Sequence, residues 1–191
     1  MEESSNKRIE TEKILKCAAE IFSKFGYQKT SMADIAREMG KTKTYLYYYF
    51  KDKETIFSTI IEEEAKTLFI KLVEETAKGD NLESKMTGYI IARFSHLQLL
   101  SDRYSNLKSE LLTFLPLIER KREKYNRQEI ELVYSILNIG STSTNEKIYK
   151  KAKIVVNINK AMEIPLFVRN SMVENSFKID DLIELILYGL T

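Results

Sequence analysis

Apolar residues recur at helical spacing along most of the chain. Between residues 9 and 25 they form one stripe, made of Ile14, Ala18, Ile21, Phe22 and Phe25. A repeat of three to four residues is typical of an amphipathic α-helix, and the glycine at 26 is placed to end it. Only six glycines and two prolines interrupt such patterns in 191 residues. The pattern therefore predicts an all-α fold.

The same periodicity predicts about nine helices in total. After the first, their approximate ranges are 31–39, 43–50, 53–79, 82–101, 104–115, 117–138, 144–169 and 179–190. Pro116 suggests a helix start or a kink, because proline disfavours a helix interior, and we place the break between the sixth and seventh helices there. We expect the first three helices to form a head domain over residues 1–51. The rest would form a helical bundle domain over residues 52–191.

Two short helices near the N-terminus carry a specific signal. Ser31 and Asp34 have the spacing of a capping box, which predicts a helix that begins there. Gly40 ends this helix, and Thr42 can cap the next one after a tight turn. Two short helices joined by a glycine-containing turn of three or four residues are a helix-turn-helix.

The helix predicted over 43–50 has two different faces. On one side lie the apolar and aromatic residues Leu46, Tyr49 and Phe50, which share a face and should pack on the first two helices. On the other side lie Lys43, Thr44, Tyr47 and Tyr48. Lysines can neutralise phosphates, and hydroxyls can bond phosphate oxygens or base edges in a DNA groove that admits a helix. A merely solvated face is the alternative explanation.

Charge is concentrated near the same segment. Residues 1–58 contain 11 of the 30 Lys and Arg residues and 9 of the 28 Asp and Glu residues, so they hold the whole net charge of +2. Seven basic residues against three acidic ones lie between 24 and 53. A local basic patch of this kind attracts a phosphate backbone, so double-stranded DNA is the expected partner.

Several classes of protein are disfavoured. A single Cys cannot form an intramolecular disulfide, the N-terminus is charged where a signal peptide is apolar, and no apolar run approaches the ~18 residues of a membrane span. We expect a cytoplasmic protein without a membrane partner. Catalytic motifs and metal-ligand spacings are not apparent, which predicts neither an enzyme nor a bound cofactor or metal.

The stretch "TSMADIAREMGKTKTYLYYYFKDKETIF" at 30–57 resembles the DNA-binding signature of the TetR family of bacterial transcription regulators. The matching pieces are T-S-x-x-D-I-A, a glycine before the turn, and L-Y-x-Y-F-K-x-K-E. The upstream "ILKCAAEIFSKFGYQKTS" is similar to the first helix of that family. The signature covers about residues 9–57, whereas the rest matches only in length, helical content and an apolar last helix.

The resemblance implies roles for individual residues. The expected DNA-binding residues are Thr30, Ser31, Lys41, Thr42, Lys43, Thr44, Tyr45, Tyr47, Tyr48 and Lys53. Tyr48 and Lys53 would lie near phosphates, and Thr30 and Ser31 near the DNA backbone. Lys41 and Tyr45 depart from the family pattern, where an apolar and a small residue are usual, so the operator sequence does not carry over from relatives.

The predicted helix 82–101 contains Arg93 in the middle of an apolar stripe. A charge there is costly unless it is paired, so we expect either an ion pair, for instance with Glu110 or another acid, or an anchor for an anionic ligand. The resemblance implies a small-molecule inducer between helices. The candidate pocket residues are Arg93, His96, Tyr104, Phe114 and Tyr134. Plain core packing is the alternative for each aromatic residue.

Helices 144–169 and 179–190 are apolar on more than one side, which predicts burial against a second copy. A homodimer through these helices would present two recognition helices to a near-palindromic operator. The leading hypothesis is a ligand-responsive DNA-binding repressor. The alternative is a constitutive DNA-binding or architectural protein, or a regulator controlled by a protein partner.

Overall fold

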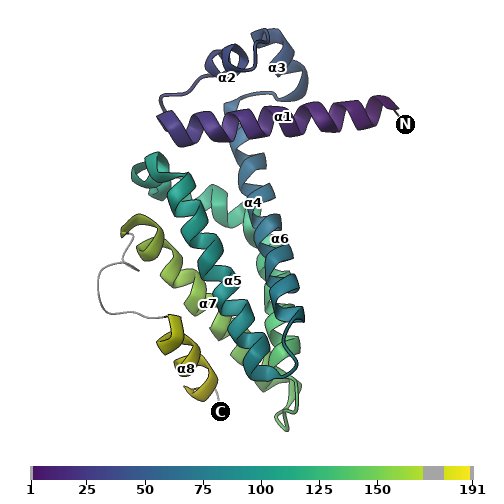
Figure 1. Ribbon diagram of the computed structural model, residues 1–191, viewed down its shortest axis with the longest axis vertical. Coiled ribbons are helices and arrows are strands. Elements are labelled where there is room, and N and C mark those ends of the chain that lie inside the picture. The colour runs from purple at the N-terminus through teal and green to yellow at the C-terminus, as the bar shows by residue number, and fades with distance from the viewer. Residues whose placement is uncertain (1, 170–178, 190–191) are drawn as a thin grey trace. The chain divides into compact units, whose positions relative to one another are not determined.

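The computed structural model describes residues 2–169 and 179–189, and the regular structure of these residues is entirely helical (Figure 1). In chain order the elements are α1 (Glu2–Phe25), α2 (Met32–Glu38), α3 (Lys43–Tyr49), α4 (Lys53–Ala77), α5 (Leu82–Arg103), the 3-10 helix η1 (Ser105–Glu110), α6 (Leu111–Leu137), α7 (Asn145–Arg169) and α8 (Ile179–Gly189). The predicted all-α fold is confirmed.

The chain divides into two compact units. One, here called the head unit, consists of Met1–Glu64 together with Arg103–Lys121. The other, the bundle unit, consists of Ala65–Asp102 together with Arg122–Thr191. The predicted domain boundary between residues 51 and 52 separates an expected DNA-binding part from an expected ligand-binding and dimerisation part. It stays a prediction.

The core of the head unit is built from the apolar stripe of α1. Ile14, Ala18 and Phe22 are fully buried, and Leu46 of α3 is buried with them. An aromatic cluster continues this core: the rings of Phe22, Tyr27, Phe57 and Phe114 lie with centroids 4.7–5.6 Å apart. Edge-to-face and tilted contacts at these separations add to the hydrophobic stabilisation.

Residues 103–121 are tied to the C-terminal end of α1 by polar contacts. The Asn106 side chain donates to the carbonyls of Ser23 and Lys24, at 2.8 and 3.2 Å. Carbonyls in the last turn of a helix lack intrahelical partners, so these bonds complete the end of α1. Gly26 follows with a φ of 85°, and a Cβ there would lie 2.8 Å from Oε1 of Glu110. The positive φ therefore favours glycine, whereas the Glu110 carboxylate is the end of a flexible side chain that can move to make room for a Cβ.

The bundle unit has its own hydrophobic core. It contains buried residues from each of its helices, among them Leu72, Tyr89, Ile136, Val155 and Ile186. Because these side chains come from α4, α5, α6, α7 and α8, one core joins all five segments. The helices of this unit are held together by burial of apolar surface rather than by local propensity.

Four details of the predicted helices were wrong. α1 begins at Glu2 rather than at about residue 9, and Phe25 at its end is 51% exposed instead of buried. The predicted break at Pro116 is absent, because α6 runs through it from Leu111. Pro116 is the sixth residue of α6, so its missing N–H removes only one helical hydrogen bond near the start. Residues 105–110, predicted as part of an α-helix, form the 3-10 helix η1.

Candidate nucleic-acid interface

α2 begins with the predicted capping box. Oγ of Ser31 accepts from the backbone N–H of Asp34 at 3.2 Å, and the Asp34 carboxylate accepts from the backbone N–H of Ser31 at 3.0 Å. The Ser31 hydroxyl also donates to the Asp34 carboxylate at 2.6 Å, and this bond, followed by the one from the Ser31 backbone N–H, lowers the pKa of Asp34. Two free N–H groups of the first turn are thereby satisfied, which fixes where α2 starts.

The turn between α2 and α3 uses Gly40 and Thr42 as predicted. Gly40 has a φ of 62°, a left-handed conformation that glycine adopts at little cost. Thr42 then caps α3, since its hydroxyl accepts from the backbone N–H of Tyr45 at 3.2 Å. Both ends of the turn are therefore specified by single residues.

α3 divides into the two predicted faces. Leu46 is fully buried, Phe50 is 5% exposed and Tyr49 is half-buried. On the opposite side, Tyr47 is 47% exposed and Tyr48 68% exposed. The residues Lys41, Thr42, Lys43 and Thr44 are also exposed. The prediction of one core face and one open face on this helix is confirmed.

The open face pairs lysines with tyrosine rings. Nζ of Lys43 lies 5.6 Å from the centroid of Tyr47, and Nζ of Lys41 lies 5.1 Å from that of Tyr45. A cation over an exposed ring gains about 0.5–1 kcal/mol and keeps its donors in water. The ammonium groups are thus placed beside α3 and stay able to meet an anion.

Tyr45 connects α3 to α1. Its hydroxyl donates to the carboxylate of Glu10 at 2.6 Å, and this bond is the largest cause of a raised Tyr45 pKa. Lys13 also donates to Glu10, at 2.7 Å. The ring of Tyr45 is half-buried, so its extra bulk relative to a small residue is used to hold α3 against α1.

Two of the residues predicted to contact DNA, Thr30 and Lys53, instead form hydrogen bonds within the head unit. Thr30 is 3% exposed, and its hydroxyl donates to the carbonyl of Gly26 at 2.7 Å. Lys53 donates to the carbonyls of Tyr27 and Thr30, both at 2.7 Å, with its Nζ 4.1 Å from the Tyr27 ring. Burial lowers the pKa of Lys53. Both residues close the connection between α1 and α2, and a phosphate contact for Lys53 stays a prediction.

The five candidate pocket residues fall in different units. Tyr104 and Phe114 belong to the head unit, where the Tyr104 hydroxyl donates to Glu64 at 3.0 Å and Phe114 joins the aromatic cluster. Arg93, His96 and Tyr134 belong to the bundle unit. Arg93 and His96 are each 2% exposed, and Tyr134 is partly buried with its ring 5.9 Å from that of Tyr149.

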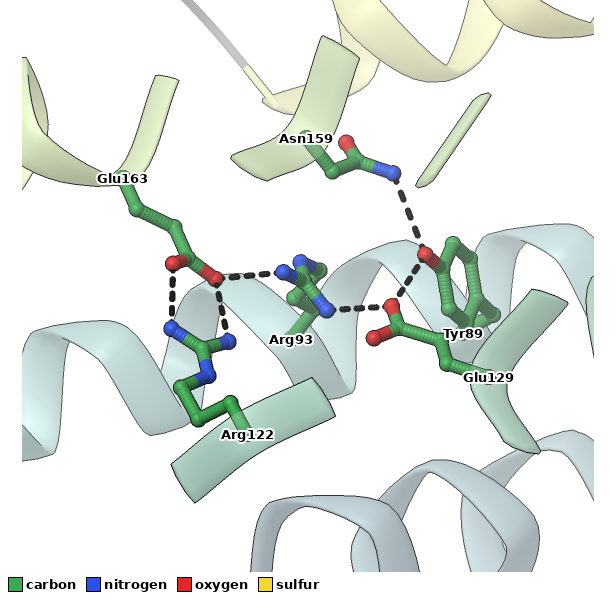
Figure 2. A network of polar contacts seen from close by, with 6 residues as sticks. All are labelled: Tyr89, Arg93, Arg122, Glu129, Asn159 and Glu163. Atoms are coloured by element: carbon green, nitrogen blue, oxygen red, sulfur yellow. Dashed lines mark hydrogen bonds and ion pairs between the residues drawn. The ribbon is translucent and has the colours of Figure 1, made fainter. Parts of the chain in front are cut away.

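Arg93 is at the centre of a buried polar network in the bundle unit (Figure 2). Its terminal nitrogens donate to Glu129 of α6 and to Glu163 of α7. Arg122 forms a two-pronged pair with Glu163, at 2.6 and 3.0 Å. Tyr89 donates to Glu129 at 2.6 Å and accepts from the Asn159 amide at 3.3 Å. The expected ion pair of Arg93 is thus present, with Glu129 and Glu163 in place of Glu110.

The electrostatics of this network are balanced. Two guanidinium groups face two carboxylates, so the four charges cancel. Burial alone raises the pKa of Glu163, but Arg122 and Arg93 lower it to about 2. Burial lowers the pKa of Arg93, and the two carboxylates more than restore it. Two buried atoms, Nε of Arg93 and Oδ1 of Asn159, have no hydrogen-bond partner among the described residues.

The acidic partners of Tyr45 and of Arg93 were not identified from the sequence. Glu10 was not linked to Tyr45, because the two lie 35 residues apart. Glu129 and Glu163 were not linked to Arg93 for the same reason, although Asn159 and Glu163 share one face of α7 at helical spacing. Polar residues that repeat on an otherwise apolar helix face are the signal that points to such a network. In the described ranges, no group of three or more His, Cys, Asp or Glu residues could hold a metal ion.

Comparison with known proteins matches residues 14–60 to the family of bacterial regulatory proteins called the tetR family. Over 68% of its length the chain is 28% identical to the HTH-type transcriptional regulator QacR of Staphylococcus aureus, covering 70% of that protein. It is 30% identical to the Fatty acid metabolism regulator protein of Bacillus subtilis over 70% of this chain and 65% of the relative. It is 33% identical to the A-factor receptor protein of Streptomyces griseus, over 39% of this chain and only 25% of that receptor.

Solved structures agree in fold. A TetR/AcrR-family transcriptional regulator from Thermobifida fusca superposes with a TM-score of 0.68 at 21% identity, over 95% of this chain and 96% of the other. A transcriptional regulator from Cytophaga hutchinsonii gives 0.65 at 26% identity, over 94% and 93%. None of the helices in the described ranges has the length and hydropathy that crossing a bilayer demands. The relatives from Staphylococcus aureus and Thermobifida fusca are named as transcriptional regulators, and residues 14–60 of this chain form a DNA-binding domain of the TetR family.

Proposed function

We propose that this protein is a ligand-responsive repressor that binds a palindromic operator as a homodimer. The observation that carries the proposal is the open face of α3, where Lys43, Thr44 and Tyr47 are exposed while Leu46 anchors the helix in the core. An α-helix of this kind fits the major groove of DNA, where amines and hydroxyls can contact phosphates and base edges. A protein with this role shares a compartment with DNA, which supports a cytoplasmic location.

Exposed apolar residues on α7 and α8 support the dimer. Ile154 and Ile158 are each 42% exposed and lie one turn apart on α7. Leu185 and Tyr188 on α8 are 68% and 70% exposed. Large apolar side chains grouped on neighbouring helices favour association with a second copy. A symmetric pair would present two recognition helices, which explains why the operator should be a palindrome.

Names among the relatives support a small-molecule inducer. One relative is a receptor for A-factor and another a regulator of fatty acid metabolism. By analogy, an inducer would favour a state of the dimer in which the two heads no longer match the operator spacing. α4 is a single helix shared by both units, so a change in the bundle unit has a continuous element through which to reach the head.

The buried network supports a second candidate function, that of a DNA-binding protein without a small-molecule inducer. Arg93, for which an ion pair and an anionic-ligand anchor were the two alternatives, has two carboxylate partners. A bundle unit stabilised by internal ion pairs is what a constitutive DNA-binding protein, or one controlled by a protein partner, would have. The remaining donor on Arg93 and acceptor on Asn159 are the atoms that an uncharged ligand group could use.

Selection of bound fragments from a pool of random duplex DNA at fixed salt tests the proposal. A palindromic consensus is expected, and Tyr47→Ala should weaken binding to it while the unfolding transition changes little. Absence of any enriched sequence would contradict specific DNA binding. A consensus with a single half-site would contradict the dimer. If no compound in a small-molecule library changes the affinity, the constitutive alternative is favoured.

A further inference from the structure

The first turns of α1 extend beyond the segment that matches the family. α1 begins at Glu2, whereas the match begins at residue 14 (Figure 1). Lys7 lies in this extension and its side chain is exposed. Its Nζ is 5.6 Å from the centroid of the Tyr48 ring, so the N-terminal part of α1 reaches the surface of α3.

The position of Lys7 relative to α3 is specific. Tyr48 is 68% exposed and follows Tyr47 on the open face of the recognition helix. Lys7 therefore makes the same kind of cation–π contact with Tyr48 that Lys43 makes with Tyr47 and Lys41 makes with Tyr45. Lys7, however, lies on α1. Three ammonium groups from three places in the chain thus surround the tyrosines of α3. An exposed cation–π contact is weak, and it leaves the three N–H donors of lysine available to another partner.

We propose that Lys7 is a further DNA contact, which neutralises a phosphate beside the groove that α3 enters. The inference rests on the proposed function. Lys7 is assigned to a phosphate because it is a point charge at the edge of the interface, on a helix other than the recognition helix. Contacts of this type raise affinity and set orientation without reading sequence.

The nearby carboxylate does not oppose this role. Glu10 lies one turn after Lys7, and it accepts hydrogen bonds from Tyr45 at 2.6 Å and Lys13 at 2.7 Å. Its charge is therefore engaged with α3 and with its own helix. Among the side chains that the structure describes, which begin at Ser5 in this helix, no carboxylate forms an ion pair with Lys7.

Arg8 provides a matched control. It has the same charge, is the next residue on the same helix and is 82% exposed. Its guanidinium pairs with Glu12 at 3.3 Å, and no contact with α3 joins it among the described residues. A comparison of the two positions therefore separates a directed contact from the general effect of a positive charge.

The test measures the affinity of full-length variants for the duplex that the wild-type protein selects, at several salt concentrations. Lys7→Ala should weaken binding about three- to tenfold at moderate salt and lower the slope of log K against log salt by about 0.9 for each protomer. Binding to an unrelated duplex should weaken by a similar factor. Lys7→Arg should restore both quantities, and Arg8→Ala should match the wild type.

Two results would overturn the assignment of Lys7. One is a Lys7→Ala protein with unchanged affinity and slope while Lys43→Ala loses binding, which would leave the proposed function intact. The other is an equal loss in Lys7→Ala and Arg8→Ala, which would show a non-directed charge effect. A wild-type protein that binds no duplex would refute the proposed function and this inference together. Lys7 is exposed, so circular dichroism should show unchanged helix content in every variant.

Discussion

The open face of α3 and the network around Arg93 use the same kinds of side chain in opposite ways. On the open face of α3, Lys43, Tyr47 and Tyr48 are exposed, and the lysine lies beside a tyrosine ring. Around Arg93, arginine, glutamate and tyrosine are buried and each charge has a partner on another helix. The first arrangement leaves charge available for a partner outside the chain. The second neutralises its charges by ion pairs within the fold.

The difference has an energetic reason. A surface ion pair or cation–π contact contributes little, because water already solvates both groups. A buried charge loses that solvation and must be compensated by its partners, so removal of one partner leaves the others uncompensated. Mutations on α3 should therefore change binding with little effect on stability, and mutations around Arg93 should do the reverse.

The largest effect is expected for Arg93→Met. The change leaves the carboxylates of Glu129 and Glu163 without their shared guanidinium, and should lower the free energy of unfolding by about 3–5 kcal/mol. Urea denaturation followed by circular dichroism measures the loss. Arg127→Met is the control, because the pair of Arg127 with Glu123 is exposed and should cost less than about 0.5 kcal/mol. Similar losses in both would mean that burial does not distinguish these pairs.

Leu46→Ala should come next. Leu46 is fully buried in the head unit, so its truncation removes apolar contact and leaves a cavity, which costs about 2–5 kcal/mol. Tyr47→Ala, one residue further on the exposed face, is the matched control for stability and should shift the unfolding midpoint much less. A Leu46→Ala protein as stable as the wild type would contradict the orientation of α3.

The pH dependence of stability should show the contribution of Glu163. Its pKa is about 2 in the folded protein against an ordinary value of 4.5, so the unfolded chain binds more protons between these values. The stabilisation is complete above about pH 4.5 and is lost as pH falls towards 2. Glu163→Gln cannot titrate, so its unfolding free energy should fall less steeply across this window. Parallel curves for the two proteins would exclude the carboxylate as the source.

The smallest effect is expected for Tyr45→Phe. The variant keeps the ring but loses the hydrogen bond to Glu10, which should cost about 1 kcal/mol of stability. If Tyr45 positions α3, DNA affinity should fall slightly and Glu10→Gln should produce a similar change. An additive loss of affinity in the double variant would instead show that Tyr45 contacts DNA independently of Glu10.

Features within one helix or one turn were predictable from the sequence. The capping box at Ser31, the turn at Gly40 and the inward position of Leu46 each depend on residues a few positions apart. Local spacing determines such features, because a helix places i, i+3 and i+4 on one side. The open face of α3 followed from the same rule, because the spacing places Lys43, Tyr47 and Tyr48 opposite the buried side. This arrangement is what suggested a helix that contacts DNA.

Long-range partners were not predictable in this way. Nothing near Arg93 in the sequence indicates Glu129 or Glu163, which lie 36 and 70 residues away. Pro116 also misled, because the cost of a proline depends on how far into a helix it falls. The inward positions of Thr30 and Lys53 depend on the path of the chain around Gly26, which no spacing rule describes.

The polar contacts between residues 103–121 and the end of α1 have a practical consequence for engineering. A hybrid regulator made by splicing only the first 51 residues onto a foreign bundle would leave behind Asn106, Glu110 and Phe114. The last carbonyls of α1 and the aromatic cluster would then be exposed to water. We expect such a hybrid to need a second transplanted stretch, the one that contains η1 and the start of α6, before its head is as stable as the parent.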